Sequence, residues 1–423
     1  MASGTTTTQS NRTAAVLEDP AAKNVEATPL APLDASKLVI SQTKNPIPIP
    51  NTLSRAATKT HTDHLLTVNW NCDNGWGIPE IVPYAPFSIE PTASVLHYAT
   101  ACFEGAKLYR GYDGKLRVFR LFENCRRMAD SATRISLPAP DPEQLLELIK
   151  ALCRVEGPRW LPGDTSRGKH LYVRPTMIAT DADLECKAPR EVLLYVVITY
   201  WPAAPESVPA PGAWKRPEGL KLWVSPEKSV RAWPGGSGNR KIAANYGPTL
   251  QLHKLAQQHG FDQVLWLYGQ EGWVTEAGGT NFFVIWKSKT GKIQLKTAPL
   301  DSGLILPGIT RKSIISLAKT RFAKTAGWEL DGQAVHAEAV QVMEEDFTIH
   351  DLIEASDEDR LLSAFAVGTA YFVKEVVEIE FRGRRVHIRA DGVPHPALLR
   401  RWLSDIMYGA EKNDWAQVIE EQI

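Results

Sequence analysis

A proline-rich stretch without hydrophobic periodicity divides this chain of 423 residues, and it constrains the fold more than any other feature. Residues 201–214 follow neither helical nor strand spacing and contain four prolines, Pro202, Pro205, Pro209 and Pro211. Such a segment is typical of a connection between domains. We therefore predict two domains after the N-terminal arm: a smaller one over 54–200 and a larger one over 215–423. An interdomain loop over 201–214 connects them.

Both parts alternate between strand-like and helix-like patterns. In the first part, short apolar runs predict strands, and one helix follows with an apolar stripe of Cys125, Met128, Ala129, Ala132 and Ile135. The predicted strands there cover 116–119, 171–175 and 193–199. In the second part we expect strands over 219–224, 264–268 and 282–286, a helix over 246–260 and another that opens at 306–311. This alternation predicts an α/β or α+β fold in two domains.

The N-terminal segment, residues 1–53, is polar and then proline-punctuated, which predicts a poorly ordered arm. It has no apolar signal core, and a mitochondrial targeting segment would be more basic and amphipathic. No run in the chain approaches the roughly 18 apolar residues of a membrane span. We expect a cytosolic protein, and a mitochondrial location stays open.

Charge and cysteine usage exclude several classes of protein. Lys+Arg and Asp+Glu are equal at 48 each, so no net charge favours nucleic acid or an anionic membrane. The five cysteines are odd in number, widely spaced and free of any Cys-x-x-Cys pair. We therefore expect a reduced compartment, no disulfide framework and no metal site.

A glycine turn delivers one lysine, and a tyrosine follows five residues later. The glycine turn is the segment 235–241, which ends in Lys241, and the tyrosine is Tyr246. A lysine that carries a cofactor as a Schiff base needs this kind of placement, with a phenol near the cofactor oxygen. A nucleotide-binding P-loop is excluded by the spacing, because Arg240 precedes the lysine and Ile242 follows it. A solvated lysine on a surface turn remains the alternative for this segment taken alone.

Three further segments supply complementary chemistry. Glu276 lies between a tight turn and an apolar strand, where a buried carboxylate needs a cation such as a pyridinium nitrogen. The segment 306–311 runs from a Pro-Gly turn into a predicted helix, whose first amides form a phosphate cradle. The segment 367–370 is a glycine turn with one hydroxyl. The alternatives are a hairpin with an exposed glutamate, an ordinary helix start and a plain turn.

In this order and at these separations, the segments resemble the branched-chain amino-acid aminotransferases, which belong to the fold-type IV enzymes that use pyridoxal phosphate. The resemblance covers residues 62–409 and includes His97-Tyr98, Phe103-Glu104-Gly105, Leu171-Tyr172-Val173-Arg174-Pro175 and Leu306-Pro307-Gly308. It implies a smaller α/β N-terminal domain and a larger C-terminal domain of pseudo-barrel form, with the cofactor between them. It also implies a homodimer in which residues near Leu184 complete the neighbour's pocket.

The resemblance assigns a role to each site residue. Lys241 would be catalytic and would carry the cofactor, with Tyr246 on its phenolic oxygen and Glu276 on its ring nitrogen. Arg127 would bind the phosphate, with its neighbour Arg126 as the alternative. The remaining cofactor contacts would be Ile309, Thr310 and Thr369. The substrate contacts would be Tyr98, Phe103, Tyr172, Arg174, Gly279, Thr369 and Ala370.

The implied reaction is a ping-pong transamination of leucine, isoleucine or valine with 2-oxoglutarate. Gly279, Thr280 and His61 depart from the family pattern near the substrate side chain, so the pocket is expected to be wider and more polar. A fold-type IV transaminase for a different amino acid or an amine is therefore the alternative. A phosphate- or nucleotide-binding protein without covalent chemistry is a second one, and a non-catalytic relative is a third.

Overall fold

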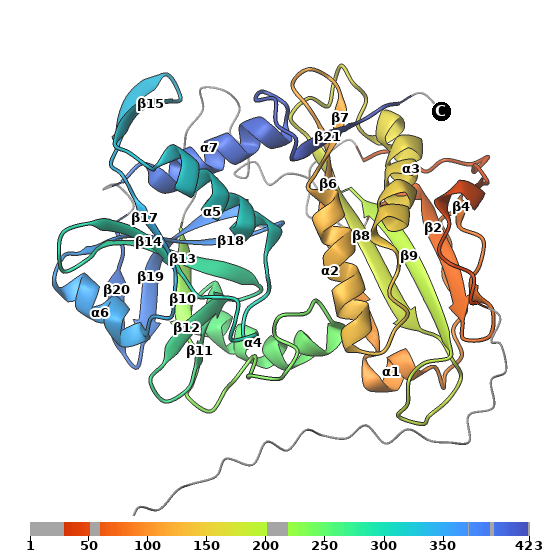
Figure 1. Ribbon diagram of the computed structural model, residues 1–423, viewed down its shortest axis with the longest axis horizontal. Coiled ribbons are helices and arrows are strands. Elements are labelled where there is room, and N and C mark those ends of the chain that lie inside the picture. Colours follow the sequence, from red (N-terminus) through yellow and green to blue (C-terminus); the bar gives the residue numbers. More distant parts are fainter. Residues whose placement is uncertain (1–28, 51–59, 201–218, 371, 390–392, 422–423) are drawn as a thin grey trace, which may run out of the picture.

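The computed structural model describes residues 29–50, 60–200, 219–370, 372–389 and 393–421. The predicted interdomain loop, 201–214, lies outside these residues. The described chain forms two large sheets that stand side by side, with helix α2 between them (Figure 1). The two-domain boundaries themselves stay a prediction.

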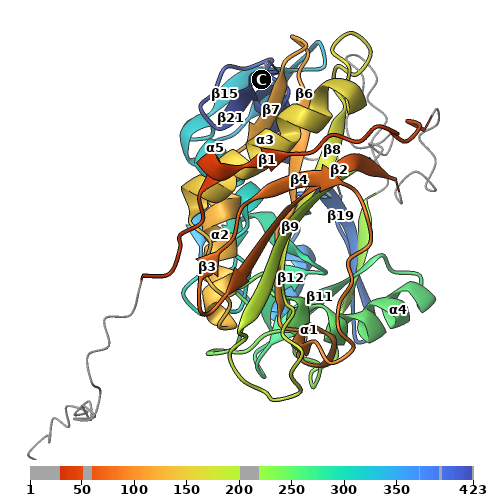
Figure 2. The same ribbon diagram turned by 90° about the vertical axis from the view of Figure 1, so that its right-hand side faces the viewer.

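The first sheet has ten strands among the described residues, in the order β1-β4-β2-β9-β8-β6-β7-β21, with β3 paired to β2 and β5 to β8. Helix α3 lies across the face of this sheet that Figure 2 presents. The strands are β1 (Val39–Ile40), β2 (His61–Asn71), β3 (Gly75–Trp76), β4 (Glu80–Pro83), β5 (Ala101–Phe103), β6 (Ala106–Arg110), β7 (Leu116–Phe119), β8 (His170–Ala179), β9 (Glu191–Thr199) and β21 (Ala416–Ile419). The helices are η1 (Ala35–Lys37), α1 (Ser94–Tyr98), α2 (Leu121–Arg134) and α3 (Pro142–Trp160).

The second sheet closes on itself. Of its nine strands in the described part of the chain, six form a ring in the order β12-β11-β10-β19-β18-β13, because β12 also pairs with β13. These strands are β10 (Leu220–Val224), β11 (Gln263–Tyr268), β12 (Trp273–Ala277), β13 (Thr280–Lys287), β18 (Leu361–Gly368) and β19 (Phe372–Phe381). β14 (Ile293–Thr297), β17 (Gln341–Glu344) and β20 (Arg384–His387) extend the ring, and a hairpin of β15 (Ala326–Leu330) and β16 (Gln333–Ala337) lies apart. The predicted α/β fold with a pseudo-barrel in the C-terminal part is confirmed.

Strand β13 explains how the barrel is packed. Its side chains alternate between two apolar cores, since successive residues of a strand point to opposite faces. Phe282 and Val284 belong to the core enclosed by the ring, whereas Phe283 and Ile285 pack in a core that includes residues of helices α5 and α7. The helices of this part are η3 (Ala243–Asn245), η4 (Gly247–Thr249), α4 (Leu250–Gln258), α5 (Ile309–Arg321), α6 (Ile349–Asp357) and α7 (His395–Met407).

The chain returns to the first sheet at its C-terminal end. β21 pairs with β7, and the ring of Tyr408 packs against Tyr109 of β6 with its hydroxyl 3.0 Å from Nδ1 of His170. These contacts join the segment that follows α7 to the first sheet.

Most predicted elements form, and two segments differ. The single helix expected over 246–260 is wrong in its first turn: two short 3-10 turns precede α4, because Pro248 disfavours the α conformation of the residue before it and that residue, Gly247, is a poor helix former. Residues 29–50, inside the segment predicted as a poorly ordered arm, lie against the first sheet. Leu33 is buried there, and the N–H of Thr43 donates to Nε2 of His64. None of the helices described in the structure is long and apolar enough to cross a membrane.

Candidate active site

The backbone of Lys241 is held by helix α2 and by strand β5 of the first sheet. Its N–H donates to Oγ of Ser131 on α2 at 2.9 Å, and its carbonyl accepts from the N–H of Phe103 on β5 at 3.1 Å. Its amine, Nζ, donates to the hydroxyl of Tyr246 at 3.1 Å and lies 4.9 Å from the centre of the Phe103 ring. The lysine and the tyrosine that the sequence pattern paired are therefore in contact.

The glycine turn before Lys241 is held by hydrogen bonds. Gly235 adopts a positive φ of 77°, which favours glycine, and its carbonyl accepts from Arg134 at 2.7 Å. The side-chain amide of Asn245 donates to the carbonyls of Ser237 and Arg240, both at 2.8 Å. These hydrogen bonds fix the path of the chain into Lys241.

Lys241 faces a cavity of about 160 Å³ between the two sheets. Nine of the predicted cofactor and substrate residues line it: Arg127, Tyr172, Lys241, Glu276, Gly279, Ile309, Thr310, Thr369 and Ala370. The hydroxyl of Thr369 donates to the carbonyl of Gly105 at 3.2 Å, so residues of both sheets meet at the cavity wall.

Arg127 enters the cavity as one member of a buried ion pair with Glu104. Its Nε and Nη2 donate to the two carboxylate oxygens at 2.6 and 2.8 Å, and Nη1 donates to the carbonyl of Pro307 at 3.0 Å. Asn124 adds a third hydrogen bond to Glu104 at 2.8 Å. Burial on its own raises the pKa of the Glu104 carboxyl, but Arg127, Lys241 and Asn124 together outweigh it and the net pKa is lowered. Glu104 therefore stays ionised, and Arg127 is held in one orientation.

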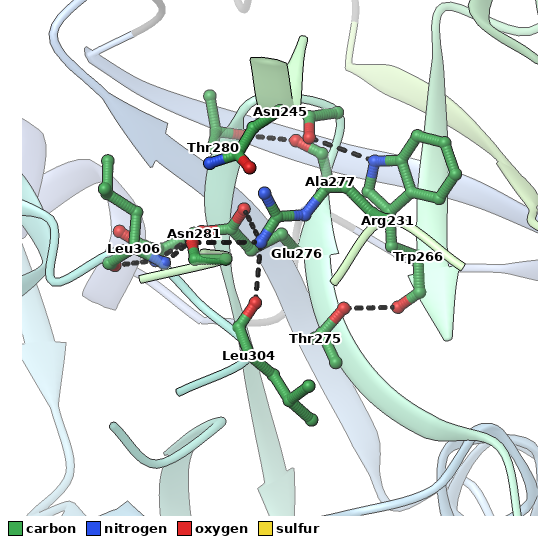
Figure 3. Close-up of polar contacts among 12 residues, drawn as sticks. Arg231, Asn245, Trp266, Thr275, Glu276, Ala277, Thr280, Asn281, Leu304 and Leu306 are labelled. Atoms are coloured by element: carbon green, nitrogen blue, oxygen red, sulfur yellow. Dashed lines mark hydrogen bonds and ion pairs between the residues drawn. The ribbon is translucent and has the colours of Figure 1, made fainter. Parts of the chain in front are cut away.

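Glu276 enters the cavity as one member of a second buried ion pair (Figure 3). Its Oε1 accepts from the N–H of Leu306 at 2.9 Å and from the amide of Asn281 at 3.2 Å. Its Oε2 lies 3.0 Å from Nη2 of Arg231. Burial raises the pKa of Glu276, and the charge of Arg231 opposes that effect without cancelling it.

Helix α5 begins at the cavity wall. Gly308 is its N-cap residue, and no side chain makes a capping hydrogen bond there. The first amides of a helix have no partner inside the helix. Ile309 and Thr310 follow and line the cavity beside Arg127. A helix N-terminus next to an arginine is suited to a phosphate group.

The structure places the other predicted residues around the cavity or away from it. Tyr246 lines a second cavity of about 170 Å³ that shares Glu276, Gly279 and Leu306 with the first. The Arg174 guanidinium donates to the Tyr172 hydroxyl at 2.9 Å and lies 4.8 Å from the Phe103 ring centre. Tyr98 does not reach the cavity: it is 41% exposed, and its hydroxyl donates to the carbonyl of Leu184. His61 stacks on Tyr84 and does not line the cavity either.

Three residues of this site had no assigned role in the sequence. Glu104 belongs to a quoted motif, and a carboxylate inside an apolar run is a signal that it meets a cation. Asn281 and Arg231 gave no usable signal, because asparagine after a turn and arginine in a polar loop are ordinary. Within the part of the chain that the structure describes, no group of three or more His, Cys, Asp or Glu side chains could hold a metal ion.

Comparisons with known proteins agree with this geometry. Residues 101–357 match the family model for amino-transferase class IV. The cytosolic branched-chain-amino-acid aminotransferase of Saccharomyces cerevisiae is 39% identical over 93% of this chain and 99% of its own length. The mitochondrial one of Schizosaccharomyces pombe is 38% identical, over 90% of this chain and 84% of its own. The cytosolic one of Mus musculus is 39% identical, over 87% and 88%.

Solved structures agree on the fold. The branched-chain amino acid aminotransferase of Escherichia coli superposes with a TM-score of 0.63 at 22% identity, over 85% of this chain and 99% of that one. The holo-form of the Thermobaculum terrenum enzyme also gives 0.63, at 21% identity, over 86% and 100%. The match to the family model and the identity over nearly full length establish what the fold suggests: this chain belongs to the class IV aminotransferases, in the branched-chain-amino-acid aminotransferase family.

Proposed function

We propose that this aminotransferase moves the amino group of leucine, isoleucine or valine to 2-oxoglutarate, in two half-reactions at the cavity of Lys241. The observation that carries the proposal is the contact of Nζ of Lys241 with the Tyr246 hydroxyl at 3.1 Å, beside a cavity with an arginine and a carboxylate in its wall. Relatives at 38 and 39% identity are named for branched-chain substrates.

Pyridoxal phosphate is the cofactor of this enzyme class, and the residues of the cavity fit it. Arg127 and the start of α5 at Ile309 and Thr310 suit its phosphate, and Tyr246 suits its phenolic oxygen. Glu276 is a buried carboxylate whose Oε2 has one partner among the described residues, Nη2 of Arg231, so an acceptor position is left that suits a protonated ring nitrogen. Thr369 completes the set of cofactor contacts that we propose.

When bound, pyridoxal phosphate supplies an aldehyde that bonds an amine and a ring that withdraws electrons from the neighbouring carbon. The residues of this chain then do the rest. Lys241 would take the proton from the substrate Cα as a base and deliver it, as an acid, to the former aldehyde carbon of the cofactor. Ionised Glu276 keeps a proton on the ring nitrogen. The turn at Thr369 and Ala370 binds the substrate carboxylate, and Phe103, Tyr172, Arg174 and Gly279 border the substrate side chain.

Replacing the lysine tests the covalent chemistry. We expect Lys241→Ala to have no measurable transaminase activity and to lack the visible absorbance band of the lysine-bound cofactor. Lys292→Ala, at an exposed lysine in the turn between β13 and β14, is the matched control and should keep both. A Lys241→Ala enzyme with the band intact would indicate a binding protein without covalent chemistry at this residue.

One observation favours a different donor as the second candidate function. A side chain added at Gly279 would meet no atom within 4 Å, so the wall between the two cavities is open at that place. An open wall accepts a longer or more polar side chain than that of leucine. A screen of purified holoenzyme with branched-chain, aromatic and simple amine donors decides between the two. Faster turnover of a non-branched donor would replace the first proposal with the second.

We also propose a homodimer. Tyr98 and Leu184 are 41% and 54% exposed and bonded to each other, and neither lines the cavity of its own chain. Exposed apolar side chains of this size suit an interface, where they would complete the neighbour's substrate pocket. Leu184→Glu should raise the fraction of monomer measured by analytical ultracentrifugation. It should also lower kcat/KM as the monomer fraction rises. A fully active monomer contradicts this proposal.

The relatives include proteins named cytosolic and proteins named mitochondrial. We propose the cytosol for this chain, the compartment named for the Saccharomyces cerevisiae and Mus musculus relatives. Cell fractionation with an antibody to the C-terminal part would test the compartment, and recovery in mitochondria would contradict it.

A further inference from the structure

We propose that Arg231 is a positioning residue that keeps the Glu276 carboxylate ionised and holds Oε2 of Glu276 toward the cofactor ring nitrogen. This inference rests on the proposed function, in which Glu276 pairs with that nitrogen. Arg231 itself would touch neither substrate nor cofactor.

The contacts of Glu276 fix the orientation of its carboxylate (Figure 3). Oε1 accepts two hydrogen bonds, from the N–H of Leu306 and the amide of Asn281, and a carboxylate oxygen has two lone pairs. Oε2 has one partner among the residues that the structure describes, Nη2 of Arg231 at 3.0 Å, so one of its two acceptor positions is left. The oxygen that remains for a ring N–H is therefore Oε2, the one beside Arg231.

Arg231 is held in place by backbone. Its Nη2 donates to the carbonyl of Leu304 at 2.6 Å and to that of Gly238 at 3.5 Å, and its side chain is 9% exposed. Gly238 belongs to the turn that delivers Lys241, and Leu304 precedes the start of α5 at Ile309. The guanidinium thus joins the lysine turn, the glutamate and the segment before the helix into one unit.

Arg231 contacts Glu276 from the side of the second cavity, away from the Lys241 cavity. It lines the second cavity of about 170 Å³, whereas Glu276 lines both that cavity and the one of Lys241. Its buried Nε has no hydrogen-bond partner in the described part of the chain. The positive charge is thus in contact with the carboxylate and outside the Lys241 cavity.

Other charges act on Glu276 more weakly. Lys241, Arg127 on α2 and Arg311 on α5 interact with it electrostatically, and Arg240 and His253 line the second cavity with Arg231. Arg231 makes the ion pair with Glu276 and is the strongest of the influences that favour its ionised form, against burial, which favours the neutral one. Without Arg231, the buried carboxyl would hold its proton at higher pH and could no longer keep the ring nitrogen protonated.

The test is the protonation of the ring nitrogen itself. Holoenzyme is reconstituted with pyridoxal phosphate that carries ¹⁵N in the ring, and the ¹⁵N chemical shift is measured near neutral pH. We expect the ¹⁵N shift of a protonated ring nitrogen in the unchanged enzyme and in Arg231→Lys, and a shift toward that of a neutral ring nitrogen in Arg231→Gln.

We also expect kcat to fall about 10- to 100-fold in Arg231→Gln, with KM little changed, which is the range seen when a residue that supports a functional group through a hydrogen bond is lost. Arg231→Met keeps an unbranched, flexible apolar stem without the charge and replaces the glutamine variant if that one does not fold.

Arg110→Gln is the matched control. Arg110 on β6 is also buried, pairs with Glu421 and donates to two carbonyls, those of Leu161 and Gly114, but does not line the Lys241 cavity. Its ¹⁵N signal should stay at the protonated position. An unmoved signal in Arg231→Gln, a moved one in Arg110→Gln, or a lysine variant that behaves like the glutamine variant would each overturn the inference and leave Arg231 a structural clamp.

A further variant separates this inference from the proposed function. If Glu276 pairs with the ring nitrogen, Glu276→Gln moves the ¹⁵N signal whatever Arg231 does. An unmoved signal in Glu276→Gln therefore contradicts the role of Glu276. A moved signal there with none in Arg231→Gln contradicts only the role of Arg231.

Discussion

Two buried arginine–glutamate pairs border the same cavity, and they present opposite charges to it. In the first pair, Glu104 accepts four hydrogen bonds: Oε1 accepts from Nε of Arg127, and Oε2 accepts from Nη2 of Arg127, the amide of Asn124 and the N–H of Gly105. Arg127 uses three of its five N–H groups on partners in the described residues, so two remain. The arginine is the member that faces the cavity.

In the second pair the roles are exchanged. Arg231 is engaged with the carbonyls of Leu304 and Gly238, while Glu276 keeps acceptor capacity on Oε2 among the described groups and lines the Lys241 cavity. The pKa directions follow the same division: that of Glu104 is lowered and that of Glu276 is raised. In each pair, one member has its hydrogen-bonding groups occupied by neighbouring protein groups, and the other member faces the cavity. The charge of that other member is the one that a ligand in the cavity meets. One end of the cavity is suited to a phosphate and the other to a pyridinium.

Changing the carboxylate of the second pair should have the largest effect. Glu276→Gln should lower kcat by about 10²–10³-fold, the range for the loss of one preorganised electrostatic group, while the cofactor still binds through the Arg127 end. Steady-state kinetics at saturating cofactor measure this. Glu271→Gln, an exposed carboxylate in the turn before β12, is the control and should keep full turnover. An unchanged kcat would mean that the negative charge of Glu276 does not contribute to the reaction.

Changing the arginine of the first pair should act on affinity instead. Arg127→Gln removes a buried, hydrogen-bonded charge and should weaken cofactor binding by at least about 2 kcal/mol, roughly 30-fold in Kd. Titration of the cofactor-free protein with pyridoxal phosphate measures it. Arg126→Gln is the control, because Arg126 is the adjacent residue of α2, is exposed and does not line the cavity. A larger loss from Arg126 than from Arg127 would reverse the assignment of the phosphate-binding residue.

The contrast between the pairs also shows what the sequence could and could not predict. Lys241, Tyr246 and Glu276 were predictable because their spacing and neighbours repeat a family pattern, and the two-domain fold followed from alternating elements on either side of 201–214. The partner of Glu276 was not predictable. Arg231 and Glu276 are 45 residues apart and come from a loop and a strand, and only the tertiary structure brings their side chains to 3.0 Å.

The same limit applies to details of the cavity wall. The sequence shows a glycine at 279 but not whether space surrounds it, which depends on the packing of neighbouring elements. Tyr98 has the right position in the motif, yet in a single chain its hydroxyl reaches Leu184 and not the cavity. Local pattern predicts which residue types are present, whereas contacts across elements decide which of them meet.

The smallest expected effect tests the two carboxylates without any ligand. The slope of unfolding free energy against pH depends on how many more protons the unfolded state binds than the native state. Glu104 has its pKa lowered in the native state, so the unfolded state binds the extra proton and stability falls as pH drops below about 4.5, the ordinary value. Glu276 has its pKa raised, so the native state binds the extra proton and stability falls as pH rises above that value.

Removing each carboxylate should therefore change the slope in opposite directions. In urea unfolding of the cofactor-free protein, Glu104→Gln should flatten the rise of stability with pH below about 4.5, and Glu276→Gln should steepen it above that value. Each change is at most about 1.4 kcal/mol per pH unit, the limit for one proton. The arginine left without its partner shifts stability by an amount that does not depend on pH in this range, so the slope isolates the carboxylate. Slope changes of the same sign would mean that the two pairs do not differ in the way their contacts indicate.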